Sequence, residues 1–108
     1  MKKLVDICPD PQQVLALEPE KLGEHVLGCL SDDNDPHIKR ATIAEFLAAD
    51  YHKSFQHEIA HAIEEALGWL FVQCMLGASP YNQDLIFLTR RGKKTAADYQ
   101  AQRLADST

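Results

Sequence analysis

A long amphipathic helix that runs directly into a strand-forming hairpin is the feature that most constrains the fold of this chain. From about Ser54 through Val72, apolar residues recur at helical spacing. Placing the residues at 100° intervals separates an apolar face, expected to be core, from a polar face, expected to meet solvent. The apolar face carries Ile59, Ile63, Ala66, Leu67, Leu70 and Cys74, and the polar face carries His57, His61, Glu64, Glu65 and Gly68.

A two-stranded ribbon is predicted after this helix. Residues 77–83 contain glycine, proline and asparagine, which interrupt the helical pattern, and Leu85–Thr89 is a short apolar run that suits a strand. The simplest pairing joins residues 74–78 to residues 84–89. A final, weak helix is expected at about residues 94–104.

Two shorter helices are predicted before the long one. Glu18-Pro19-Glu20 marks the first start, because proline is tolerated at the first helical position and acidic groups favour the positive end of the helix dipole. Residues 31–36 are rich in Ser, Asp and Asn and predict a linker turn. Thr42, with Glu45 three residues later, is predicted to cap a second helix that ends at about Tyr51.

Length and composition indicate one small globular domain. The 108 residues suffice for one core, and 45% hydrophobic with 25% charged residues is ordinary for a globular chain. We expect an arm at residues 1–16, with a helical turn, and a domain at 17–105. No apolar run approaches the roughly 20 residues of a membrane span and no secretory segment is evident, so a cytoplasmic protein is expected. The three cysteines lack the spacing of a disulfide framework or zinc knuckle, and Cys29 and Cys74 are expected in the core.

Charge is distributed unevenly along the chain. Residues 1–84 hold six Lys/Arg against 14 Asp/Glu, net −8, whereas residues 85–108 hold five against two, net +3. The overall acidity argues against a strongly electrostatic nucleic-acid binder, but a local basic cluster can still form a phosphate-facing patch. The cluster consists of Arg90, Arg91, Lys93 and Lys94, for which a merely solvated turn is the alternative interpretation.

Three helices followed by a hairpin resemble the winged helix-turn-helix superfamily. The phrase Phe87-Leu88-Thr89-x-x-Gly92 is similar to the strand-to-helix junction of the multiple-antibiotic-resistance repressor family, and the resemblance covers residues 17–105. More loosely, the chain is similar to winged-helix modules of bacterial abortive-infection or phage-defence proteins. The resemblance implies a mainly helical α+β fold with three helices, a β-hairpin wing and a short C-terminal helix. It also implies a bacterial transcription regulator that binds DNA, with a homodimer as one form.

Under this resemblance the third helix would be the recognition helix and residues 79–84 the wing tip. Recognition helices normally offer Arg, Lys, Asn, Gln or Ser to bases and phosphates, whereas carboxylates repel phosphates. Here the exposed residues are Gln56, His57, Glu58, His61, Glu64 and Glu65. The acidic residues Glu58, Glu64 and Glu65 are therefore predicted to bind a protein partner. Tyr81 at the wing tip either stacks on a base or packs against its own hairpin.

His57-Glu58-Ile59-Ala60-His61 matches the H-E-x-x-H pattern of zinc metalloproteases. Two histidines four residues apart on a helix can grip one zinc ion, and the glutamate between them can act as a general base. No histidine follows His61, and Glu64 lies about 10 Å along the axis from His57, too far to converge on the same ion. His25, His37 or His52 would have to be delivered by the fold. A metalloprotease is thus a minor alternative, and no metal site or catalytic residue is predicted.

The sequence therefore predicts a non-enzymatic winged-helix regulatory or accessory module without a cofactor. The leading hypothesis is weak, non-specific contact with nucleic acid through a basic wing. The alternative is a protein–protein interaction subunit of a larger bacterial assembly, which binds through the acidic third helix. The candidate nucleic-acid-binding residues are Arg90, Arg91, Lys93, Lys94 and Tyr81.

Overall fold

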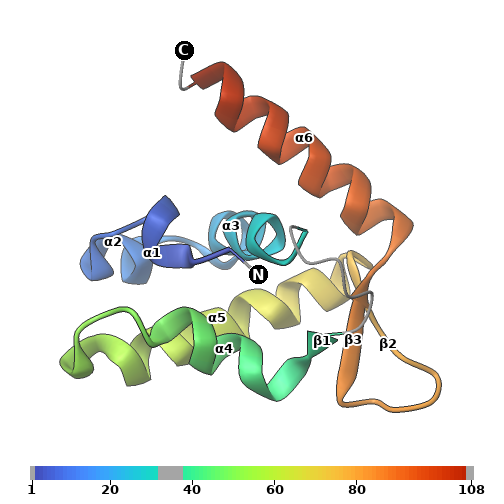
Figure 1. The fold of residues 1–108 in the computed structure, drawn as a ribbon, viewed down its shortest axis with the longest axis horizontal. Coiled ribbons are helices and arrows are strands. Elements are labelled where there is room, and N and C mark those ends of the chain that lie inside the picture. Colours follow the sequence, from blue (N-terminus) through green and yellow to red (C-terminus); the bar gives the residue numbers. More distant parts are fainter. Residues whose placement is uncertain (1, 32–37, 107–108) are drawn as a thin grey trace.

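A computed structural model describes residues 2–31 and 38–106 of the chain (Figure 1). Over these residues the fold is mainly helical α+β, with six helices and one three-stranded antiparallel sheet. No helix among them combines the length and the apolar content that crossing a membrane requires. The elements are α1 (Leu4–Ile7), α2 (Pro11–Ala16), α3 (Pro19–Leu30), β1 (Ile38–Lys39), α4 (Arg40–Ala48), α5 (Lys53–Val72), β2 (Leu76–Ala78), β3 (Leu85–Leu88) and α6 (Arg90–Asp106).

Helix α5 is the centre of the core. It lies between α3 and α4 and also contacts α2 (Figure 1). The predicted apolar face is confirmed, with one exception: Cys74 is exposed. The reason is that α5 ends at Val72 and Cys74 adopts φ 60°, which turns the chain toward the hairpin. The fully buried residues of this face are Ile59, Ile63, Ala66, Leu67 and Leu70.

The first predicted helix is confirmed, and the second begins earlier than predicted. Helix α3 starts at Pro19, as the acidic proline-containing start indicated. Helix α4 starts at Arg40, so Thr42 lies inside it, and the Thr42 hydroxyl donates to the Lys39 carbonyl (2.8 Å) instead of capping the helix. The predicted linker turn at residues 31–36 falls almost entirely outside the described residues.

The first 16 residues are more ordered than an arm with one helical turn. They form α1 and α2, and they contribute the fully buried Leu4 and Val14 to the same core as α5. Tyr51, which follows α4, donates its hydroxyl to the Cys8 carbonyl (2.6 Å) and so fixes the α1–α2 connection. This segment is part of the packed body.

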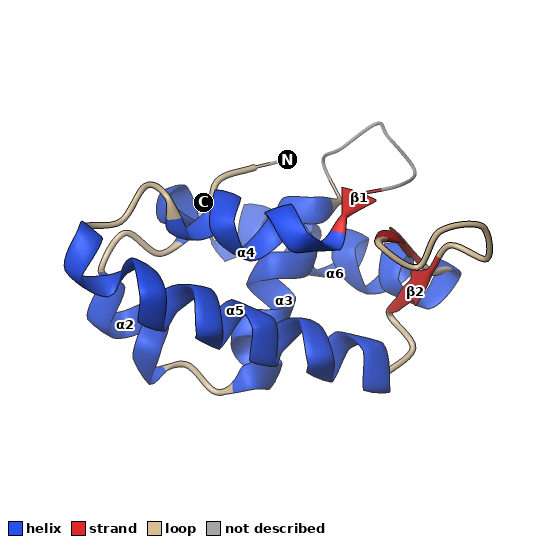
Figure 2. Cartoon of the chain, turned by 90° about the horizontal axis from the view of Figure 1, so that it is seen from below, coloured by secondary structure: helices blue, strands red, loops and turns tan. Residues whose placement is uncertain are grey.

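The predicted hairpin is confirmed as β2 paired antiparallel with β3, with Gly77 opposite Phe87. A third strand was not predicted: β1 pairs with the other edge of β3, placing Ile38 opposite Ile86. The sheet order is therefore β1-β3-β2, and Ile86 on the central strand is fully buried. Figure 2 shows the labelled strands gathered at one end of the helical body.

Helix α6 begins at Arg90, four residues before the predicted start, because Thr89 caps it. The Thr89 hydroxyl accepts from the Gly92 N–H (3.0 Å) and donates to the Cys74 carbonyl (2.6 Å). Gly92 is pressed against the backbone of Met75: a Cβ at position 92 would lie 2.0 Å from the Met75 carbonyl oxygen. The phrase Thr89-x-x-Gly92 is thus a structural junction that joins α6 to the turn after α5.

Replacing Gly92 with alanine should lower the free energy of unfolding by about 1–3 kcal/mol, because the new methyl group collides with backbone. Gly68 offers a matched control, since nothing lies within 4 Å of a Cβ built there. Gly68→Ala should raise the free energy of unfolding by up to about 1 kcal/mol through helix propensity. Urea denaturation of both variants measures these changes, and equal effects at the two positions would contradict the Gly92–Met75 contact.

Candidate nucleic-acid interface

The four basic residues of the junction form the first turn of α6. Arg90, Arg91, Lys93 and Lys94 are all exposed, and none makes an ion pair with another residue that the structure describes. Strand β3 ends at Leu88, so Arg90 and Arg91 belong to α6 and not to the hairpin. The N-terminal end of a helix dipole is positive, and its first N–H groups favour anions. Side-chain charge and dipole therefore add at this turn, which we call the basic turn.

The loop between β2 and β3 lies at the other end of the hairpin from the basic turn. Its residues 79–84 contain no lysine or arginine. Tyr81 in this loop is 95% exposed, so packing against its own hairpin is excluded and its ring is open to solvent. Strand β3 separates the loop from the basic turn by roughly 13 Å, four residues at about 3.3 Å each. The structure does not bring Tyr81 and the basic residues together.

The outer face of α5 is acidic and exposed, as predicted. Glu58, Glu64 and Glu65 all face solvent. Glu64 makes an ion pair with Arg40 of α4 (3.7 Å), and the Arg40 guanidinium also lies 4.8 Å above the centre of the Phe71 ring. This face presents carboxylates where a recognition helix would present donors to DNA.

His57 and His61 lie side by side on the same outer face, with ring centres 4.3 Å apart. Two other histidines are engaged elsewhere: His25 contacts Tyr99, and His52 caps α5 by accepting from the Ser54 N–H (3.2 Å). His37 falls outside the described residues. Within the described residues, no group of three or more His, Cys, Asp or Glu side chains is placed to hold a metal ion.

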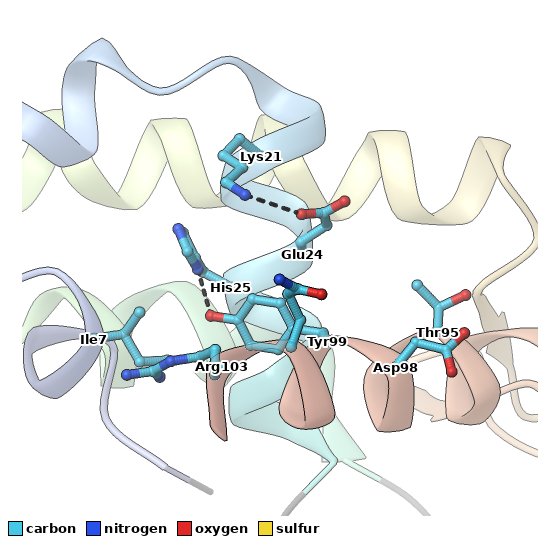
Figure 3. A pocket seen from close by; sticks show the side chains of 9 residues that line it. Ile7, Lys21, Glu24, His25, Thr95, Asp98, Tyr99 and Arg103 are labelled. Atoms are coloured by element: carbon cyan, nitrogen blue, oxygen red, sulfur yellow. Dashed lines mark hydrogen bonds and ion pairs between the residues drawn. The ribbon is translucent and has the colours of Figure 1, made fainter. Parts of the chain in front are cut away.

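Helix α6 is seated on α3 through Tyr99, a contact that the sequence did not reveal (Figure 3). The Tyr99 hydroxyl hydrogen-bonds to His25 Nδ1 (2.5 Å), and its ring lies so close to Gly28 that a Cβ there would be 2.5 Å from it. Gln100 Nε2 donates to the Gly28 carbonyl (3.2 Å). The partners are more than 70 residues apart, and only helical spacing within α6 hints at a packed face.

The two buried cysteines are not suited to nucleophilic chemistry. Burial raises the pKa of the Cys8 thiol, with a smaller contribution from Asp10, and burial raises the pKa of Cys29 to about 12. Because the thiolate is the reactive form, these shifts disfavour nucleophilic chemistry at either thiol. Cys29 is a core residue, as expected from its position on α3.

Comparisons with protein-family models, with curated proteins and with solved structures found no match for this chain. The functional assignment therefore depends on the charges, exposures and contacts described above. They distinguish three regions: the basic turn, the acidic outer face of α5, and the contact between α3 and α6.

The purified protein should retain less than about 0.1 zinc ion per chain after dialysis without chelator, because a tight site needs a third protein ligand beside His57 and His61. Elemental analysis of wild type and a His57→Ala/His61→Ala variant measures this. One zinc per chain in wild type, lost in the variant, would instead support a metal centre on α5.

Proposed function

We propose that this chain is a non-enzymatic winged-helix module that contacts nucleic acid weakly, and without sequence preference, through the basic turn. The element order supports the fold: α3, α4 and α5 are followed directly by the β2–β3 hairpin, the order that the winged-helix resemblance implies. The short strand β1, between α3 and α4, joins the hairpin and completes the sheet.

The observation that carries the function is the exposure of four cations on the first turn of α6. Each cation at the positive end of a helix costs stability, typically about 0.3–1 kcal/mol at low ionic strength. A bound phosphate relieves this cost by neutralising the cations and accepting from the free N–H groups. Helix stability alone would favour acidic residues here, so the basic turn fits a polyanionic partner.

The acidic face of α5 argues against base reading in a major groove. Sequence-specific recognition requires side chains that hydrogen-bond to base edges, within reach of phosphates that repel carboxylates. Glu58, Glu64 and Glu65 would meet those phosphates at close range. The basic turn lies at the other, sheet-bearing end of α5, so nucleic acid can contact it while α5 stays clear (Figure 1). Such contact is to the backbone and carries no sequence information.

An Arg90→Ala/Arg91→Ala variant should lose most of the affinity of wild type for a labelled DNA duplex. With about three phosphates contacted, log affinity of the wild type should fall against log salt with a slope of about −3, and the slope of the variant should be about −1. Fluorescence anisotropy between about 20 and 200 mM salt covers the range in which counterion release contributes strongly to the affinity. Alanine favours helix, so the variant should stay folded.

A matched control removes two cations from the far end of the molecule. Lys53 starts α5, and Lys3 pairs with Asp50 in the turn before α5 (3.6 Å). The Lys3→Ala/Lys53→Ala variant has the same net charge as the arginine variant but should bind like wild type. Equal losses in the two variants would show that only net charge matters. No binding by wild type at about 50 mM salt would remove the nucleic-acid proposal.

The second candidate function is binding of a basic protein partner by the acidic face of α5. It is favoured by the three exposed glutamates and by Val72, which is 78% exposed at the end of the same helix. A charged rim beside an exposed apolar side chain is a common composition for a protein interface. In this case the chain acts as a subunit of a larger assembly.

Reversing Glu64 and Glu65 to lysine separates the two candidates. The fold should lose less than about 1 kcal/mol of unfolding free energy, because the Arg40–Glu64 pair is exposed and such pairs contribute little. If α5 faces away from nucleic acid, the salt slope should stay that of wild type. A steeper slope, by about one for each new phosphate contact, would mean that α5 does lie against the duplex.

A loss above about 3 kcal/mol in urea denaturation would show that this face is packed in the folded protein, since exposed charges do not contribute on that scale. The single variant Glu65→Lys provides the control for the ion pair, because Glu65 has no salt-bridge partner among the described residues.

A further inference from the structure

A cavity of about 400 Å³ lies between α3 and α6, beside α1 (Figure 3). This volume falls within the range of small-molecule binding sites, roughly 300–1,000 Å³. The cavity extends along α6 from Thr95 to Arg103, roughly 12 Å at 1.5 Å per residue. Its lining residues are Ile7, Lys21, Glu24, His25, Thr95, Asp98, Tyr99, Gln102 and Arg103.

The charges of the cavity sum to zero but lie at separate places. Lys21 and Glu24, both on α3, form an ion pair with each other (3.5 Å). Arg103 lies at one end, beside Ile7, and Asp98 lies at the other end, beside Thr95 (Figure 3). Neither Asp98 nor Arg103 makes an ion pair with another residue that the structure describes. A ligand with a single sign of charge would gain at one end and lose at the other, whereas a zwitterion gains at both.

The Arg103 end is rich in hydrogen-bond donors. The Tyr99 hydroxyl hydrogen-bonds to His25 Nδ1, and burial raises the pKa of Tyr99 while the nearby charge of Arg103 lowers it. Burial, and then the charges of Lys21 and Arg103, lower the pKa of His25. The guanidinium of Arg103 has further donors in a planar fork, which suits a carboxylate.

The distance between the two ends sets the length of the ligand. Asp98 and Arg103 are five residues apart, roughly 7.5 Å along the axis of α6, and their side chains add to this separation. An extended peptide advances about 3.3 Å per residue, so three residues place an amine and a carboxylate roughly 10 Å apart. A single amino acid is too short to reach both. The Tyr99 ring lies between the two ends, where peptide groups would lie (Figure 3).

We propose that the cavity between α3 and α6 binds a short zwitterionic peptide of about three residues, with its terminal ammonium on Asp98 and its terminal carboxylate on Arg103. Because the ligand contacts both helices, it holds α6 against α3 beside the contact that Tyr99 makes with α3. This site is separate from the basic turn and does not depend on nucleic-acid binding.

Trialanine is the probe, compared with its N-acetyl and its C-terminal amide forms, which each lack one charge. Isothermal calorimetry on the full chain should show saturable binding of trialanine, weakened about tenfold by either cap, as expected for loss of one charge-assisted contact. In Asp98→Asn the acetyl cap should lose its effect while the amide cap keeps it. In Arg103→Gln the pattern should be reversed.

Both variants change exposed side chains, and circular dichroism checks that they remain folded. Lys53→Gln, at the start of α5 and outside the cavity, is the matched control and should bind all three probes like wild type. The absence of saturable trialanine binding up to about 10 mM would mean that the binding free energy is weaker than about 3 kcal/mol. That result would overturn the proposal. So would capped and uncapped peptides binding equally, or variants that respond to both caps like wild type.

Discussion

The hydrogen bonds of Thr89 hold the turn after α5 and the start of α6 in one place, and the rest of the C-terminal half depends on this junction. The Thr89 N–H donates to the Met75 carbonyl (3.1 Å), its hydroxyl donates to the Cys74 carbonyl, and the same hydroxyl accepts from the Gly92 N–H. One residue thus closes the β2–β3 hairpin and caps a helix. Gly92 permits the approach because no side chain intervenes at Met75.

The junction determines where both proposed sites lie. Because α6 starts immediately after Thr89, the four basic residues share one exposed turn instead of a flexible hairpin end. Because α6 leaves the junction in a fixed direction, Tyr99 reaches Gly28 and His25 on α3, and the cavity forms beside this contact (Figures 1 and 3). A basic cluster and a polar cavity, which adjoin along α6 at Lys94 and Thr95, are therefore presented by the same helix.

The sequence predicts those parts of the fold that repeat a pattern over many residues. The buried face of α5 extends from Ile59 to Leu70, about three turns, and Ile59, Ile63 and Leu67 are all fully buried. The sequence does not predict β1, because its two residues gain their strand conformation only by pairing with β3. It places the start of α6 too late, because basic residues are unfavourable at a helix N-terminus and the Thr89 cap outweighs them. The cavity is not predictable, since its polar residues come from helices far apart in the chain and carry no local pattern.

The acidic face of α5 and the basic turn of α6 suit the two helices to different partners. In a groove-reading protein the second helix of the helix-turn-helix approaches the bases, but in the corresponding helix α5 the carboxylates would make that approach repulsive within a Debye length of about 8–10 Å. Under the proposed function, the polyanion would contact the other end of the molecule, where the helix dipole and the side chains of α6 act together. There it would meet no lysine or arginine from the hairpin loop, so the attraction would come from few charges and would depend only shallowly on salt.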